Sequence, residues 1–375
     1  MFDYLIVGAG IAGASLAWEL AGQGRVLLAE AEAQPGEHST GRSAAMFMES
    51  YGPPQVRALT RASRTFYGQP PAGFSDAPIL SPRGVLYVAW QGHEAALEAL
   101  WAQLSNSGSP VERVDAATAL ARLPVLRAEG LLGAIAEPEA MDIDVHALHQ
   151  GYLRGARRRG AELRLSAELQ LARHDGEVWQ VHFTDGSRAT ARHLVNAAGA
   201  WADVVATRCG VATLGLQPKR RSAFTFDPPL GVDHRRWPTV CAVDESWYFK
   251  PDAGQLLGSP ANADPTGPHD VQPEELDIAL GIDGIQHHTS LHIHRPRRTW
   301  AGLRTFAPDG ELVLGFDATA PGFFWLAGQG GYGIQSAAGA AALAAAQLTR
   351  KAIPPVLVGF GVDPPMVAPT RSALR

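Results

Sequence analysis

The sequence predicts a two-lobed α/β fold, in which a Rossmann-like dinucleotide-binding domain is joined to a second domain built on a mixed β-sheet. Three observations support this prediction. The chain has 375 residues, which is too long for one small domain and short for three. It opens with a strand, a glycine-rich turn and a helix, and a second strand–glycine loop–helix unit lies near its end. We therefore expect the dinucleotide-binding domain to draw on both ends of the chain.

Composition places the chain among globular proteins and removes several functional classes. Apolar residues make up 46% and charged residues 18%, a balance that can bury a sizeable core and is opposite to that of disorder. The net charge of −5 provides no general basic field, so we expect no nucleic-acid partner. The two cysteines, Cys209 and Cys241, are too few for a disulfide framework or a thiolate zinc cage, and they fit a reducing cytoplasm.

We also expect no membrane-spanning segment. Residues Tyr4 to Trp18 are mostly apolar, but Asp3 stands where a signal peptide would carry a positive charge, and glycines interrupt the run. No other apolar run reaches the ~20 residues that a membrane helix needs. A cytoplasmic location follows as an expectation, and peripheral association with the inner face of the membrane stays open.

The first thirty residues carry a dinucleotide-binding fingerprint in its full context. The apolar run Tyr4–Val7 is typical of a strand in a parallel sheet, Gly8–Gly13 has the spacing GxGxxG, and Ala14–Leu20 predicts a helix. A second strand, Arg25–Ala29, ends at the acid Glu30. This order places the glycine-rich turn at a helix N-terminus, where free N–H groups can bind a diphosphate.

Each position of the fingerprint has a physical role. Gly8 permits the tight turn, Gly10 lets a diphosphate approach the main chain, and Gly13 allows the helix to pack closely on the strand. Glu30 is placed to accept hydrogen bonds from the ribose hydroxyls of an adenosine. The motif alone does not distinguish NAD from FAD.

Three further segments favour a flavin. The polar residues 31–45 follow the ribose-binding acid and offer many short donors to a long cofactor, although a surface loop would have the same composition. An alternating strand Val178–Thr184, a turn at Asp185-Gly186 and a returning strand lead into the small residues 197–200. The apolar strand Phe323–Ala327 runs into a second glycine loop, and the helix after it could stabilise negative charge on a reduced ring.

Four segments resemble those of the D-amino acid oxidase superfamily of flavoproteins: GAGIAG with Glu30, HSTGRSAA (38–45), VNAAGAW (195–201) and AGQGGYGIQ (327–335). Within that superfamily, LQPKRRSAF (216–224) and GSPANAD (258–264) are most similar to FAD-dependent D-amino acid dehydrogenases of the D-arginine dehydrogenase type. The resemblance implies a two-lobed α/β flavoprotein. It implies FAD-binding segments at 1–80, 142–217 and 315–375, and substrate-domain segments at 81–141 and 218–314.

The resemblance also implies a set of residues that contact FAD. In chain order these are Gly8, Gly10, Ile11, Ala12, Gly13, Glu30, Ala31, Ser39, Thr40, Arg42, Ser43, Ala44, Ala45, Ala198, Gly199, Trp201, Gly330, Gly331, Tyr332, Gly333, Ile334 and Gln335.

Two arginines lie in or beside apolar strands. Arg221 precedes the alternating run Ser222–Phe226, and Arg304 lies within Trp300–Phe306. A charge in such a strand is costly unless it is paired. A substrate carboxylate, which arginine binds bidentately, is one possible partner, and a structural ion pair is the other. The resemblance favours the carboxylate, because both positions match the family's carboxylate-binding arginines.

The resemblance extends to the rest of the catalytic site. Tyr51 and Tyr248 match tyrosines that border the substrate, Tyr51 on a mobile covering loop, although buried tyrosines more often only pack. Gly331 matches a residue whose carbonyl faces the substrate amine. The implied reaction is hydride transfer from the α-carbon of a D-amino acid to flavin N5, then hydrolysis to a 2-oxo acid and ammonia. We expect no side-chain general base, and an electron acceptor other than oxygen, such as a quinone or a respiratory chain component.

Two departures from the family pattern concern the substrate side chain. Members that prefer basic substrates place an acid in the side-chain pocket and a histidine in the covering loop, where this chain has Val85 and Met46. A guanidinium facing Val85 would lose a charge-assisted hydrogen bond, typically worth about 1.5–3 kcal/mol. The departure favours apolar or aromatic D-amino acids, unless the loop bends inward and brings Glu49 into the pocket.

The main alternative is a flavin oxidase of sarcosine, glycine or another secondary amine. Such oxidases use a lysine in a strand like Gly254–Gly258 and a cysteine before the last glycine loop for covalent flavin attachment. This chain has no lysine in that strand and no cysteine after Cys241, so we expect non-covalent FAD. A non-catalytic FAD-binding or tRNA-binding protein is a further alternative, which the acidic net charge and the two arginines disfavour.

Three runs, Ser222–Phe226, Trp247–Lys250 and Thr289–Arg295, predict strands of the second lobe's sheet. His292 and His294 would share one face of the last strand, but no acid or cysteine completes a ligand set, so we expect a surface strand and no metal. We interpret His146 and His149, on a predicted helix, in the same way.

Overall fold

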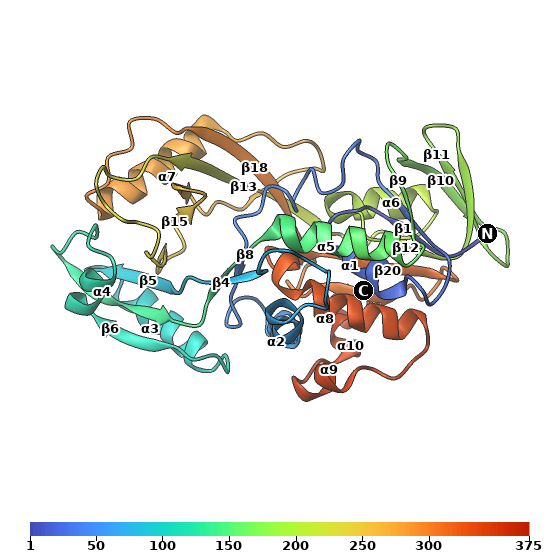
Figure 1. The fold of residues 1–375 in the computed structure, drawn as a ribbon, viewed down its shortest axis with the longest axis horizontal. Helices are drawn as coiled ribbons and strands as arrows, with labels where there is room; N and C mark the ends of the chain where they lie inside the picture. The colour runs from blue at the N-terminus through green and yellow to red at the C-terminus, as the bar shows by residue number, and fades with distance from the viewer. Residues whose placement is uncertain (375) are drawn as a thin grey trace.

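The computed structural model describes residues 1–374 and contains two large sheets that lie side by side along the long axis of the molecule (Figure 1). The first sheet has eight strands, in the order β10-β11-β12-β1-β2-β9, with β20 paired to β12 and β19 to β20. Their bounds are β1 Phe2–Val7, β2 Val26–Ala29, β9 Glu162–Arg164, β10 Leu169–His174, β11 Trp179–Phe183, β12 Arg188–Asn196, β19 Val313–Phe316 and β20 Phe323–Ala327.

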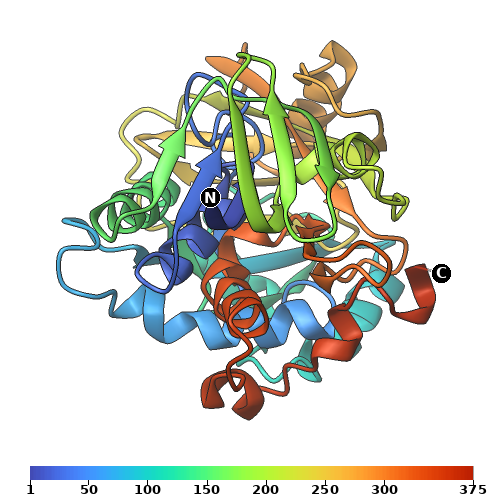
Figure 2. The ribbon, with the colours of Figure 1, turned by 90° about the vertical axis from the view of Figure 1, so that its right-hand side faces the viewer.

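The centre of this sheet is parallel and buried on both faces. Strand β1 pairs in parallel with β2 and β12, and β12 with β20, whereas β10, β11 and β19 add antiparallel pairs at its margin. One face packs on helices α1 (Ile11–Leu20) and α8 (Gly333–Leu348), with α5 (Val145–Arg158) packed on α1 and α2 (Pro54–Gly68) packed on α8. Helix α6 (Ala202–Arg208) covers the other face, and the view in Figure 2 shows the sheet between these layers. Short helices α9 (Pro355–Gly359) and α10 (Pro364–Val367) and the 3₁₀ turns Gly199–Trp201 and Ser372–Leu374 complete this lobe.

The second sheet has ten strands, in the order β21-β18-β13-β16-β15-β14-β5-β7-β6, with β17 beside β13. Their bounds are β5 Val85–Trp90, β6 Glu112–Asp115, β7 Leu131–Glu137, β13 Gln217–Phe226, β14 Thr239–Ala242, β15 Tyr248–Asp252, β16 Gln255–Ser259, β17 Asp264–Pro265, β18 Arg298–Phe306 and β21 Gln329–Gly330. The associated helices are α3 (Glu94–Ser105), α4 (Ala116–Arg122) and α7 (Glu275–His288). A small sheet of β3 (Met46–Phe47), β4 (Leu80–Pro82) and β8 (Met141–Ile143) lies between the lobes.

The two faces of the second sheet differ in character because side chains alternate along a strand. On one face Phe224 and Phe249 pack with Ile285 of α7 in an apolar core. The other face carries Arg221 and Tyr248, and it points toward the first lobe. The alternation therefore separates the core of this lobe from its polar, inward-facing surface.

The predicted strand Thr289–Arg295 is wrong. Thr289 makes only an isolated bridge to Leu126, and the segment after it has no ladder partner. His292 and His294 are exposed on this irregular segment, and residues 1–374 contain no cluster of metal-ligating side chains. The expectation that His149 lies on the surface is also wrong, because His149 on α5 is buried against the glycine-rich turn.

We propose that the FAD-binding domain comprises residues 1–80, 142–217 and 315–375, and that the substrate domain comprises residues 81–141 and 218–314. The first sheet takes its strands from residues 2–29, 162–196 and 313–327. Within residues 1–374, no helix combines the length and apolar character needed to cross a membrane.

Candidate active site

A cavity of about 440 Å³ lies where the two lobes meet, within the range of volumes typical of ligand sites. Its walls come from the glycine-rich turn after β1, the loop 36–44, the segment 197–201, and the inward face of β13, β15 and β18. Residues 329–334, which lead into α8, close one side. Segments from both ends and the middle of the chain therefore share one cavity, as the sequence predicts.

The glycines of the first turn are required by close contacts. Gly8 has φ +99°, and a Cβ there would lie 2.6 Å from the carbonyl oxygen of Ala197. A Cβ on Gly13 would lie 1.9 Å from the carbonyl oxygen of Gly8, so helix and strand pack closely only without a side chain. The turn is thus held against both the helix after it and the strand beside it.

Two helices begin at the cavity without a capping side chain. Gly10 is the N-cap of α1 and Tyr332 that of α8, and neither first turn contains an acidic residue. Gly10 and Ile11 from α1, and Gly333 and Ile334 from α8, line the cavity. Both helix dipoles therefore direct their positive ends toward the same space, which favours negatively charged groups there.

Glu30 and the loop after it are tied to the turn. The Glu30 carboxylate accepts hydrogen bonds from the main-chain N–H of Ala9 (2.7 Å) and of Glu32 (3.1 Å), and the side chain still lines the cavity. Thr40 Oγ1 accepts from the N–H of Ile11 at 3.0 Å, and Ser39 Oγ donates to the carbonyl of Leu303 at 2.5 Å. These bonds shape the loop around the start of α1.

Arg42, which we expected to contact FAD, uses most of its guanidinium donors on protein acceptors. It binds Asp270 (2.5 Å) and the carbonyl oxygens of Val271, Ala301 and Glu37. Its main-chain carbonyl accepts from Trp300 Nε1 at 3.0 Å. The side chain therefore clamps the loop of the first lobe to the second lobe.

Arg221 and Arg304 line the cavity from adjacent strands. In the antiparallel pairing of β13 and β18, Arg221 faces Gly302 and Arg304 faces Lys219, which places both arginines on the same face of the sheet. Within residues 1–374, neither guanidinium forms an ion pair with a carboxylate. Burial and the neighbouring charge of Arg304 lower the pKa of Arg221, as expected where two like charges face one cavity.

Aromatic hydroxyls surround the two arginines. Tyr248 lines the cavity, and Tyr51 lies close enough to Arg304 to affect its pKa, which burial lowers and Tyr51 raises. The ring of Tyr51 meets that of Tyr332 edge-on at 4.9 Å. A Cβ on Gly331 would lie 2.9 Å from a terminal nitrogen of Arg304, so a larger residue there would displace the guanidinium. Arg221, Tyr248, Arg304 and Gly331 thus line the cavity, whereas Tyr51 lies behind this lining with its ring against Tyr332.

Most, but not all, of the expected cofactor contacts face the cavity. Its lining includes Gly8, Gly10, Ile11, Ala12, Glu30, Ala31, Ser39, Thr40, Arg42, Ser43, Ala44, Ala198, Gly199, Trp201, Gly330, Gly331, Gly333 and Ile334. Gly13, Ala45, Tyr332 and Gln335 lie behind this lining. Gln335 is buried, and its side chain bonds to the loop that carries Tyr51 instead of pointing into the cavity.

None of the three residues expected in the side-chain pocket lines the cavity: Val85 lies on the inward face of the second sheet, Met46 packs against it from β3, and Glu49 lies in the loop after β3. Val85 is buried, and the sulfur of Met46 accepts a hydrogen bond of 3.3 Å from Thr239 Oγ1. Glu49 does not bend inward, because its carboxylate pairs with Arg64 Nε at 2.5 Å. That ion pair removes Glu49 as the acid of the pocket in this structure.

Three ionisable residues near the site were not anticipated. Glu137 is buried beside Val85, accepts a hydrogen bond of 2.5 Å from Ser50 Oγ, and has a pKa raised by burial. Burial lowers the pKa of Arg221 and raises that of Tyr332. The negative charge of Glu245, at the exposed turn after β14, opposes the first of these shifts and adds to the second. His149 bonds to the Ala9 carbonyl at 2.8 Å. Long-range packing decides where these three residues lie. For His149 alone the sequence holds a signal of burial, because apolar residues lie four positions away from it along the predicted helix.

A family model described as DAO, FAD dependent oxidoreductase, matches residues 3–347, which is nearly the whole chain. The chain belongs to this family. It is accordingly an FAD-dependent oxidoreductase, and its cofactor is FAD.

Solved structures of other proteins share this fold. Glycine oxidase from Geobacillus kaustophilus matches with a TM-score of 0.83 at 24% identity, over 96% of this chain and 98% of that one. Iminodiacetate oxidase from Chelativorans sp. BNC1 matches at 0.79 and 23%, over 94% and 96%. L-proline dehydrogenase from P. horikoshii matches at 0.76 and 19%, over 96% of each chain. At these identities the likeness establishes the fold.

The residues present fit the FAD of this family. The absence of side chains at Gly8 and Gly10 leaves the main chain open to a diphosphate, and the N-terminus of α1 offers it N–H donors. Glu30 lies at the end of β2 with a carboxylate that can take up ribose hydroxyls. The start of α8 and the two arginines line another part of the same cavity.

Proposed function

We propose that this flavoprotein is a dehydrogenase of D-amino acids, with FAD held non-covalently and an electron acceptor other than oxygen. The observation that carries the proposal is the pair of guanidinium groups, Arg221 and Arg304, that share the cavity without a carboxylate partner. Two half-buried cations are costly to leave unpaired. A substrate with a carboxylate group would neutralise them, and arginine binds such a group bidentately.

Each residue would then have a defined task. Arg221 and Arg304 hold the carboxylate, while Tyr51 and Tyr248 enclose the substrate and exclude water. The main chain at Gly331 lies directly against Arg304, so its carbonyl can accept a hydrogen bond from the substrate amine. When bound, FAD would supply the acceptor for a hydride from the substrate α-carbon, and water would hydrolyse the resulting imino acid to a 2-oxo acid and ammonia.

Apolar or aromatic side chains suit the proposed substrate better than basic ones. The sheet face next to the arginines carries Val85 and Tyr87, with Met46 and Cys241 packed beside them. Glu49 is engaged by Arg64. Glu137 lies beside Val85, but its carboxyl group accepts a hydrogen bond from Ser50 and burial raises its pKa, which favours the neutral form. Glu245 lies at an exposed turn, so a basic substrate would have to reach one of these two acids to gain an ionic partner.

Oxidation of glycine, sarcosine or another secondary amine is the second candidate, favoured by the fold match to glycine oxidase. Against it, strand β16 has no lysine, and Lys250 on β15 is bonded to Asp142 at 2.6 Å. Its ammonium group is therefore occupied by a structural ion pair and is buried. An oxidase would also have to react rapidly with oxygen, whereas the proposed dehydrogenase would not.

The test is to mix the purified holoenzyme, without oxygen, with D- and L-amino acids, sarcosine and glycine, and to follow the flavin absorbance near 450 nm. We expect bleaching by D-amino acids, with D-phenylalanine and D-leucine ahead of D-arginine. Admission of oxygen should restore the absorbance slowly, and a quinone should restore it quickly. Bleaching by sarcosine or glycine and by no D-amino acid would overturn the proposal, while the fold and the cofactor would stand.

A further inference from the structure

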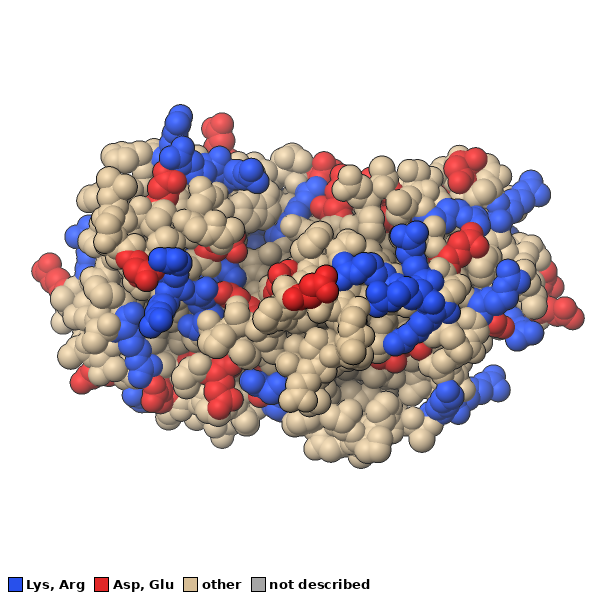
Figure 3. Space-filling model, in the orientation of Figure 1, with Lys and Arg blue, Asp and Glu red and all other residues tan. Residues whose placement is uncertain are grey.

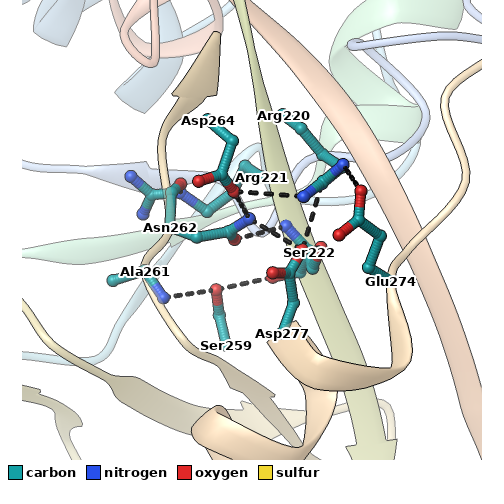
Figure 4. Close-up of polar contacts among 9 residues, drawn as sticks. All are labelled: Arg220, Arg221, Ser222, Ser259, Ala261, Asn262, Asp264, Glu274 and Asp277. Carbon is teal, nitrogen blue, oxygen red and sulfur yellow. Dashed lines mark hydrogen bonds and ion pairs between the residues drawn. The ribbon is translucent and has the colours of Figure 1, made fainter. Parts of the chain in front are cut away.

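The direction of the Arg221 side chain is set by a segment outside its own strand. Arg221 Nε donates a hydrogen bond of 2.5 Å to the main-chain carbonyl of Asn262 (Figure 4). The two terminal nitrogens of Arg221 have no protein partner within residues 1–374, and the side chain lines the cavity. One donor therefore fixes the guanidinium, and the pair of donors suited to a carboxylate stays free.

Asn262 occupies a gap in the second sheet. Strand β16 pairs with β13 up to Gly258 opposite Phe224, and the chain rejoins β13 only at Asp264 opposite Arg220. The main-chain groups of Ser222 between these points have no strand partner on that side. Asn262 Oδ1 accepts from the Ser222 N–H at 2.8 Å, and Ser259 Oγ donates to the Ser222 carbonyl at 2.7 Å. Side chains of residues 259–262 thus replace the missing ladder bonds.

Asp277 of α7 anchors this arrangement from the opposite face of β13. One carboxylate oxygen accepts from Asn262 Nδ2 (3.0 Å), Ser222 Oγ (2.7 Å) and Arg220 Nε (3.0 Å). Figure 4 shows Arg220 and Arg221 extending to opposite sides of the strand, with Asn262 between the two groups. Asp277 is buried, so these bonds are shielded from water.

The segment would not keep this shape by local preference. Ala261 has φ +51°, a left-handed conformation that is unfavourable for alanine, and its N–H is held by Ser259 Oγ at 3.1 Å. When the Asn262 side chain loses its partners, the segment can relax toward ordinary angles. Such a change would move the carbonyl that receives Arg221 Nε.

From these contacts we infer that Asn262 and Asp277 are positioning residues that aim Arg221 at the substrate carboxylate. Neither residue lines the cavity; Asn262 acts through its main-chain carbonyl, and Asp277 acts through Asn262. The inference rests on the proposed function, because it takes Arg221 to bind a carboxylate.

The experiment measures how tightly the FAD-loaded protein binds two probes of equal shape, propionate and propionamide, by the change in the flavin spectrum. We expect Asn262→Ala to weaken propionate binding about fivefold, the effect of one lost hydrogen bond, and to leave propionamide binding unchanged. In Asp277→Asn, one side-chain oxygen remains to accept from the three donors. The propionate affinity of this variant should therefore lie between those of the wild type and Asn262→Ala. Asn106→Ala, an exposed asparagine at the end of α3, is the matched control.

The outcomes separate this inference from the proposed function. Arg221→Gln measured alongside reports on the function: if it leaves propionate binding unchanged, Arg221 does not bind carboxylates and the proposed function fails. If Arg221→Gln weakens propionate but Asn262→Ala does not, only the positioning role fails. If Asn262→Ala weakens the binding of propionate and propionamide equally, the substitution disturbs the site as a whole, and this result would also overturn the inference. Should Asn262→Ala lose its FAD, Asp277→Asn decides alone: an unchanged preference for propionate rules the inference out.

Discussion

The side chain of Gln335 holds the main chain of Tyr51, although 284 positions separate them in the sequence. Gln335 Nε2 donates a hydrogen bond of 3.2 Å to the Tyr51 carbonyl and another of 3.1 Å to Thr60 Oγ1, and its oxygen accepts from the Met48 N–H at 3.4 Å. The first turn of α8, which opens on the cavity, is therefore connected to the loop whose tyrosine contacts Arg304.

This link predicts that Gln335→Leu lowers substrate affinity without removing FAD. Release of the loop would leave Tyr51 free to move from Arg304, and lost hydrogen bonds of about 1 kcal/mol each correspond to a roughly fivefold or larger rise in the dissociation constant. The dissociation constant of propionate for the FAD-loaded variant measures the effect. Gln347→Leu, on the same helix but outside the cavity lining, should bind propionate like the wild type. Equal affinities for both variants would show that the loop is held by other contacts.

Arg304→Lys should weaken binding of the reducing amino acid by at least about 30-fold, because a lysine cannot reproduce a bidentate contact in a buried site. The amino acid concentration that gives half-maximal flavin bleaching measures this effect, and FAD content should stay near one per chain. Arg297→Lys is the control, since Arg297 lies just before β18 in an exposed ion pair with Asp227. A normal response of Arg304→Lys would mean that the carboxylate binds elsewhere.

Gly13→Ala should abolish stable FAD binding. The added Cβ would lie 1.9 Å from the Gly8 carbonyl oxygen, so the turn or the helix must shift, at a cost of about 1–3 kcal/mol to the folded state. Flavin content after purification and the unfolding temperature measure both effects. Gly68→Ala, at the end of α2 with no atom within 4 Å of the new Cβ, should leave them unchanged. Full flavin content in Gly13→Ala would contradict the packing argument.

Stability should fall with pH below about 6.5 partly through His149. Burial, opposed by the bond to the Ala9 carbonyl, lowers the pKa of His149 below its ordinary value of 6.5. The unfolded chain therefore takes up the proton first, and the stabilisation that is complete above pH 6.5 is lost as the pH falls through the lower, folded-state pKa. Unfolding temperatures between pH 5 and 8 should vary less in His149→Gln than in wild type. His294→Gln, an exposed control, should follow the wild-type profile.

Much of the dinucleotide-binding lobe could be predicted because its signals are local. The strand–turn–helix unit at Gly8–Gly13, the acid Glu30 and the second glycine loop each depend on neighbours within a few residues. The resemblance also selected Arg221 and Arg304, which face the same cavity in the structure. The strand predicted at 289–295 failed because an apolar alternation there reflects burial of Leu291 and Ile293 against the core under α7, not ladder pairing.

By itself, the sequence determined the order of elements, the glycine positions and the identity of the charged side chains, since main-chain geometry and periodicity follow from residue types near one another. The tertiary structure alone decided which of those charges stay free. Glu49 and Arg42 are satisfied by partners 15 and 228 positions away, whereas Arg221 and Arg304 meet across two strands with no acid between them. Such pairing is settled by contacts between distant segments, because electrostatic and hydrogen-bond energies depend on distance in space and not on separation along the chain.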